Sequence, residues 1–145
     1  MPTSLEKRDH SNIETYWGWV EVIVSQPEYC LKRMWMSPHR QSSLEYHMVK
    51  SETYIVESGY LTVGLRDGKA RGKNVEVRLG PGDILHIPPG TMHMRIAGDM
   101  DVSILEVSTH DDPGDTYIVE DGKVYTHTVE KEESGETVSG QRQFG

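Results

Sequence analysis

The sequence predicts an all-β domain, either a sandwich or a barrel. Its middle part is a series of short segments rich in Val, Ile, Tyr, Trp and Thr, and several of them alternate in polarity. The breaks between these segments hold Gly, Pro, Asp and Ser, which are the usual turn residues. No window of about 11 residues or more has a helical period. Many short strands separated by turns are typical of sandwiches and barrels.

The expected strands follow one another closely. The first three cover residues 17–24, 29–36 and 43–48, and a Ser-Gln-Pro turn at 25–27 separates the first two. The next three cover 53–56, 60–65 and 75–79, with a break at Ser58-Gly59 and a polar stretch that begins at Asp67-Gly68. Strand 84–87 lies between two rigid turns, 80–83 and 88–90, because proline fixes φ and glycine accepts unusual conformations. Strands 93–96 and 102–107 complete the set, separated by Gly98-Asp99.

The length of 145 residues suits one domain. The stretch from Glu130 to the end has almost no apolar residues, and residues 1–12 are similarly polar. We therefore predict a folded domain over 13–129, with a flexible segment at 1–12 and a disordered tail at 130–145.

Charge and cysteine content exclude some functions. Fifteen basic and 23 acidic side chains give a formal net charge of −8, which argues against general binding to nucleic acid. The single cysteine, Cys30, rules out an internal disulfide and fits a reducing compartment. The chain has no apolar stretch of the length of a signal peptide or a membrane span. We expect a cytoplasmic protein with no membrane partner.

Four polar residues are candidate metal ligands. Glu45 and His47 lie two apart on one expected strand, so they share a face, and Glu52 and His93 begin later strands. Two imidazoles and two carboxylates inside a barrel suit Zn, Fe, Mn, Co or Ni and do not select among them. The alternative is a solvated polar face. The apolar neighbourhood favours the metal, since unpaired inward charges are costly to bury.

Two segments resemble the two conserved motifs of the cupin superfamily. The segment EYHMVKSETYIVESG, residues 45–59, resembles the first motif, with Glu45 in place of its first His. The segment GDILHIPPGTMH, residues 82–93, resembles the second motif in every spacing. The resemblance implies a single cupin barrel, that is, a double-stranded β-helix or jelly roll, with a metal pocket in its mouth.

Between about Tyr16 and Asp121, the chain also resembles the cupin domain of type II mannose-6-phosphate isomerases, which occurs alone or fused to mannose-1-phosphate guanylyltransferases. The matching pieces include WG with EV at 17–22, YCLKR at 29–33, SLEYH at 43–47 and LGPGD at 79–83. The resemblance implies a metal held by Glu45, His47, Glu52 and His93, with zinc as the first expectation and Fe, Mn, Co or Ni as alternatives. Glu45 replaces a neutral Gln, Lys50 an Arg and Tyr54 a Trp, so the substrate can differ.

That resemblance implies aldose–ketose isomerisation of a sugar phosphate through an enediol, which needs a Lewis acid and a base. We expect Lys50 and His86 as catalytic candidates, although a strand histidine is more often only hydrogen-bonded. Lys32, Arg33, Tyr54 and Arg95 are the expected substrate-binding residues. The alternative for the basic residues among them is that they are solvated strand residues.

Two other functions stay open. A site of two His and two carboxylates also suits a metal-dependent cupin dioxygenase or lyase, and some cupins bind a small ligand without catalysis. The resemblance also implies a homodimer. In each case the expected partner is a small molecule, and a sugar phosphate is the first expectation.

Overall fold

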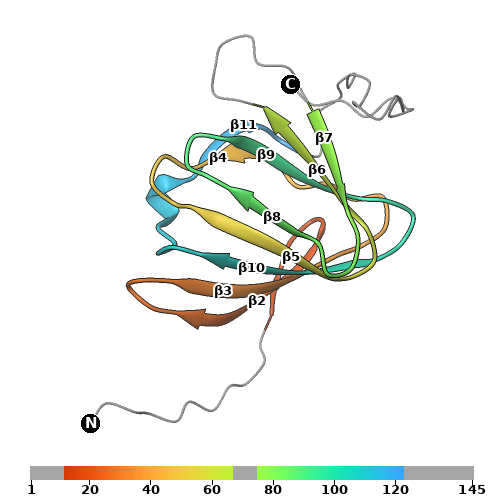
Figure 1. The fold of residues 1–145 in the computed structure, drawn as a ribbon, viewed down its shortest axis with the longest axis horizontal. Coiled ribbons are helices and arrows are strands. Elements are labelled where there is room, and N and C mark those ends of the chain that lie inside the picture. Colours follow the sequence, from red (N-terminus) through yellow and green to blue (C-terminus); the bar gives the residue numbers. More distant parts are fainter. Residues whose placement is uncertain (1–11, 67–74, 123–145) are drawn as a thin grey trace.

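A computed structural model describes residues 12–66 and 75–122, which form two antiparallel sheets (Figure 1). The first sheet has the strand order β1-β2-β3-β10-β5-β8. Its strands are β1 (Ile13–Glu14), β2 (Gly18–Ser25), β3 (Cys30–Met36), β10 (Val102–Ser108), β5 (Glu52–Ser58) and β8 (Ile84–Ile87).

The second sheet has the order β11-β4-β9-β6-β7. Its strands are β11 (Tyr117–Glu120), β4 (Leu44–Tyr46), β9 (Met92–Ala97), β6 (Leu61–Arg66) and β7 (Val75–Leu79), and a short 3₁₀ helix, η1 (Pro113–Asp115), precedes β11. From β3 to β10 the chain passes repeatedly between the two sheets, as it does in a jelly roll. The predicted all-β jelly-roll barrel is therefore confirmed.

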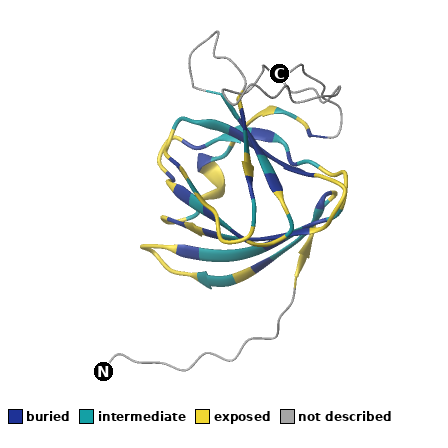
Figure 2. Ribbon diagram, turned by 45° about the vertical axis from the view of Figure 1, so that its right-hand side comes forward, coloured by how far each residue is buried: buried dark blue, intermediate teal, exposed yellow. Residues whose placement is uncertain are grey.

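The core lies between the sheets because strand residues alternate between an inner and an outer face. On β5, for example, Glu52, Tyr54 and Val56 are buried and the residues between them are only partly covered. Figure 2 shows this alternation of buried and less buried positions along the strands. Met36, Leu61 and Ile104 contribute to the main apolar cluster. A charged residue on the inner face is therefore an exception among mainly apolar residues.

The nine expected strands agree with observed ones to within two residues at each end, whereas β1 and β11 are not among the expected strands. The main difference is β4, which ends at Tyr46 rather than at residue 48, so His47 lies just beyond the strand. The predicted flexible segments 1–12 and 130–145, apart from Asn12, and the turn at Asp67-Gly68 lie outside the described residues, as does the domain end at 129. Within residues 12–66 and 75–122, no helix is long and apolar enough to cross a membrane.

Candidate metal centre

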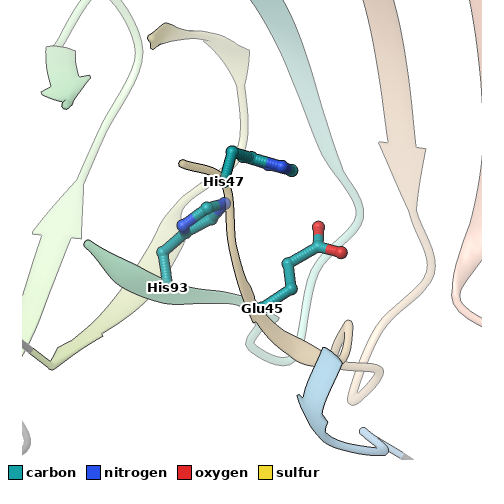
Figure 3. Close-up of side chains that lie close together, drawn as sticks. All are labelled: Glu45, His47 and His93. Atoms are coloured by element: carbon teal, nitrogen blue, oxygen red, sulfur yellow. The ribbon is translucent and has the colours of Figure 1, made fainter. Parts of the chain in front are cut away.

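Two imidazoles and a carboxylate meet where β4 and β9 lie side by side. Glu45 on β4 is directly opposite His93 on β9, and His47 follows the end of β4. One potential ligand atom from each residue lies within 4.8 Å of the other two, and Figure 3 shows the side chains gathered around a common space. His47 and His93 are buried. Imidazole and carboxylate are ligands for first-row divalent ions, so this group could bind a metal.

Glu52 reaches the same imidazoles from β5 in the other sheet. Its Oε1 lies 2.6 Å from Nε2 of His93 and 3.5 Å from Nε2 of His47. Burial alone would raise the pKa of Glu52, but its close contacts with His47 and His93 outweigh burial and lower it. Glu52 therefore offers an ionised oxygen to the space between the two rings.

Backbone carbonyls orient both histidines. Nδ1 of His93 lies 2.9 Å from the carbonyl oxygen of Thr91, and Nδ1 of His47 lies 3.2 Å from that of Asp115. A carbonyl oxygen only accepts, so each Nδ1 carries the hydrogen and donates it. In a ring that carries only this hydrogen, the lone pair of Nε2 faces Glu52, which is the usual arrangement for a histidine that ligates a metal.

The buried atoms at the centre fit a bound cation. Among the described residues, Oε1 of Glu52 and Nε2 of His93 are buried atoms without a hydrogen-bond partner. Two acceptors only 2.6 Å apart repel each other unless a proton or a metal ion lies between them. The donor set is therefore chemically suited to a divalent ion, and it does not determine which one.

Asp115 in η1 fixes the loop that carries His47. Its carboxylate accepts backbone hydrogen bonds from Met48, Val49 and Lys50, at 2.9–3.2 Å. Burial raises the pKa of Asp115, but these amide hydrogen bonds outweigh it and lower the pKa. The same residue accepts the His47 Nδ1 hydrogen with its carbonyl. Asp115 explains why β4 ends early, because the amides after His47 bond to its carboxylate instead of to a strand.

Lys50 lies in the wall of the site among three carboxylates. Its Nζ is 3.1 Å from Asp111, 3.4 Å from Glu52 and 3.7 Å from Glu106. Burial lowers the pKa of Lys50, but these carboxylates outweigh burial and raise the pKa. Lys50 is therefore a held cation at neutral pH. This protonation state suits charge stabilisation better than the removal of a proton from a substrate.

Tyr54 and Arg95 lie together beside the histidines. Nη1 of Arg95 donates to the hydroxyl of Tyr54 at 3.0 Å, and the guanidinium lies 5.1 Å from the ring centre of Trp17. The Tyr54 ring meets His93 edge-on with centres 6.3 Å apart. Among the described residues, Nε of Arg95 is a buried nitrogen without a hydrogen-bond partner. Tyr54 is fully buried, so Arg95 is the one of these two that lines the adjoining cavity.

A cavity of about 290 Å³ opens beside the predicted ligands. Its lining includes Glu45, His47, Lys32, Lys50, Arg95 and Glu106. Glu106 on β10 was not predicted as a site residue. Burial and the neighbouring Glu52 raise its pKa to about 7. Its position could have been predicted, because strand alternation puts it on the same inner face as Val102 and Ile104.

The structure does not bring Arg33 and His86 into this site. Arg33 follows Lys32 on β3, so it points to the opposite face, where it binds Glu21 and Glu57 at 3.2 and 2.9 Å. His86 is exposed on β8, and its Nδ1 lies 2.9 Å from Oγ1 of Thr53 on the neighbouring strand. The other predicted residues, Lys32, Lys50, Tyr54 and Arg95, lie in or next to the cavity.

Three solved structures share this architecture. The capsular polysaccharide assembling protein CapF from Staphylococcus aureus has a TM-score of 0.71 and 20% identity over 79% of this chain and 32% of that one. Oxalate decarboxylase from Bacillus subtilis has a TM-score of 0.67 and 19% identity over 77% of this chain and 30% of that one. KdgF from Halomonas sp. has a TM-score of 0.65 and 16% identity over 79% of this chain and 98% of that one.

These similarities are similarities of fold. The chain spans about a third of the length of the first two proteins and nearly all of KdgF. No curated protein matches the sequence. Fold and site together define a jelly-roll domain with a histidine and glutamate group that could hold a metal. The sequence pattern of the cupin domain matches residues 32–108, and the chain belongs to that family.

Proposed function

We propose that this cupin is a metal-dependent isomerase of a small sugar phosphate, of the mannose-6-phosphate isomerase type. One observation carries the proposal: the Nε2 atoms of His47 and His93 converge with the carboxylate of Glu52 beside a cavity that also holds basic side chains. The metal would be held by Glu45, His47, Glu52 and His93. A divalent ion bound there would polarise the carbonyl and hydroxyl oxygens of an aldose or ketose.

The remaining side chains of the cavity supply the other requirements of the reaction. The isomerisation moves a proton between C1 and C2, and Glu106 lines the cavity without belonging to the predicted ligand set. We assign that proton transfer to Glu106. Arg95 keeps its positive charge, and it can stabilise the negative charge that develops on the substrate oxygens.

Glu45 affects the Lewis acidity of a metal ion bound at the proposed centre. With Glu52 it gives the ligand set two negative charges, so the charge of a bound dication is formally neutralised. A neutral amide at position 45 would leave more positive charge on the metal and make it the stronger Lewis acid. We therefore expect Glu45→Gln to retain a metal centre and to change turnover more than the Michaelis constant.

An isomerase assay tests the function. Full-length protein is reconstituted separately with Zn²⁺, Mn²⁺, Co²⁺, Ni²⁺ and, without oxygen, Fe²⁺, and is assayed with mannose 6-phosphate and fructose 6-phosphate. His47→Ala should abolish turnover, and His86→Ala is the matched control because that imidazole is exposed and outside the cavity. Absence of turnover with every metal would refute the isomerase proposal. Full activity in His47→Ala would refute the assignment of the site.

The same ligand types also suit a second candidate function, that of a metal-dependent dioxygenase or lyase. Two imidazoles with carboxylates also suit iron and leave coordination positions for a substrate and for oxygen. Iron retained on purification, with oxygen consumed in the presence of a small carboxylic acid and no isomerase turnover, would favour this candidate over the first.

A further inference from the structure

Two lysines from different parts of the chain share one carboxylate at the cavity. Lys32 on β3 and Lys50, which precedes β5, both bind Asp111, which lies between β10 and η1. The Lys50 Nζ is 3.1 Å from Oδ1 of Asp111, and Lys32 binds Oδ2. Each ammonium group therefore holds a different oxygen of the same carboxylate. Two ammonium groups that hold one carboxylate in this way are also arranged to hold another small anion in its place.

The other acidic neighbours of the lysines are much more deeply enclosed. The side chains of Glu52 and Glu106 are 1% and 5% exposed, whereas that of Asp111 is 26% exposed. Glu52 is also held beside His47 and His93. Of these three carboxylates, Asp111 is therefore the one that an incoming ligand can replace.

The backbone around Asp111 is anchored independently of its side chain. Thr109 donates its amide hydrogen to the Ser51 carbonyl at 3.0 Å, and the Asp112 side chain accepts from the amide of Gly114 at the start of η1. The Asp111 carboxylate can therefore leave the lysines by side-chain rotation alone. The loop keeps its place when the carboxylate moves.

We propose that Lys32 and Lys50 bind the phosphate group of the substrate, and that Asp111 occupies this position until the phosphate displaces it. The identity of the phosphate rests on the proposed function. A phosphate carries about −1.5 to −2 charges at neutral pH and several acceptor oxygens, so it satisfies two ammonium groups better than one carboxylate does. A neutral sugar has no group that can replace Asp111. The exchange therefore selects for phosphorylated substrates.

The proposed exchange predicts whether a substitution of Asp111 strengthens or weakens the binding of phosphate. Asp111→Asn removes the competing negative charge and leaves the two lysines in place, so it should strengthen binding of inorganic phosphate by about tenfold. A purely structural role for Asp111 predicts weaker binding of phosphate in Asp111→Asn, because the lysines would lose their orientation. Asp112→Asn is the matched control, since it makes the same charge change one residue away and asparagine is an equally good helix cap.

A calorimetric titration with inorganic phosphate tests the proposal. It uses the full-length protein, first as purified and then after treatment with EDTA. The EDTA arm separates phosphate bound by lysine from phosphate bound by metal. We expect tighter binding in Asp111→Asn, unchanged binding in Asp112→Asn, and loss of the gain in the double variant Asp111→Asn with Lys32→Gln. Equal or weaker binding in Asp111→Asn, or a double variant that keeps the gain, would overturn the proposal. Stronger binding of acetate than of phosphate in Asp111→Asn would overturn the assignment to phosphate.

The result is independent of the isomerase assay. The phosphate result with no isomerase turnover would retain the anion site and reject the proposed reaction. Isomerase turnover with unchanged phosphate binding in Asp111→Asn would retain the reaction and reject the anion site. Circular dichroism of each variant confirms that it is folded before its affinity is compared.

Discussion

Asp115 shows how one residue can organise a site without belonging to the ligand set. Its carboxylate binds three successive amides after His47, and its carbonyl binds the His47 ring. Loss of the carboxylate frees the loop, and the ring then loses its fixed direction. Groups that orient a metal ligand commonly change metal affinity by ~10–100-fold when they are removed.

Asp115→Ala should therefore lower the affinity for Zn²⁺ by about 10–100-fold. Asp115→Asn should have a smaller effect, because its amide oxygen still accepts one or two of the backbone hydrogen bonds. Competition with a chelating dye measures the affinity, and Asp99→Asn, at an exposed position, is the control for the loss of charge. Wild-type affinity in Asp115→Ala would show that the loop orients His47 without this residue.

The place of a site residue can be predicted from the sequence where it depends only on the residue's own strand. Neighbouring residues of a strand face opposite ways, so Lys32 and Arg33 on β3 cannot both face the cavity. The alternation along β10 likewise puts Glu106 on the inner face. The role of Asp115 could not be predicted in this way. Its partners are about 65 residues away in the sequence, and only the completed fold brings η1 against them.

At the scale of elements, the turns hold the ligand-bearing strands in position. The Pro88–Gly90 turn precedes His93, and the Gly90 amide donates to the His47 carbonyl at 2.6 Å. Turn residues and strand types are local signals, which explains why nine of the observed strands, all but β1 and β11, could be predicted to within two residues. The early end of β4 could not be predicted, because it depends on the distant Asp115.

Gly59 joins β5 in one sheet to β6 in the other with φ of +78°, and a Cβ there would lie 2.2 Å from the Asp101 carbonyl oxygen. Gly59→Ala combines backbone strain with this clash and should lower the free energy of unfolding by roughly 2–5 kcal/mol. Gly98→Ala is the control, because a Cβ there meets nothing within 4 Å. Urea denaturation compares the two variants, and equal stability would show that the turn can adjust to a side chain.

At the scale of the whole molecule, the proposed metal connects the two sheets. Glu45, His47 and His93 are carried by the second sheet or the loop beside it, and Glu52 belongs to the first. An ion bound by all four would link the sheets across the mouth of the barrel. A ligand that binds only the folded state stabilises it in proportion to the logarithm of its concentration.

Saturating Zn²⁺ should therefore raise the melting temperature, with a gain of about 2.7 kcal/mol at a free concentration of 100 times Kd. Differential scanning calorimetry measures the shift, and EDTA should reverse it. The shift should disappear in His93→Ala and remain in His86→Ala. An equal shift in His93→Ala would mean that the ion binds elsewhere.

Metal stoichiometry is the most direct test of the proposed metal centre. Full-length protein is loaded separately with Zn²⁺, Mn²⁺, Fe²⁺, Co²⁺ or Ni²⁺, passed through a desalting column and analysed for metal and protein together. We expect one equivalent of zinc in the wild type and in His86→Ala, and none in folded His47→Ala. A wild type that retains no Zn²⁺, Mn²⁺, Fe²⁺, Co²⁺ or Ni²⁺, or a His47→Ala variant that retains a full equivalent, would contradict the proposed centre.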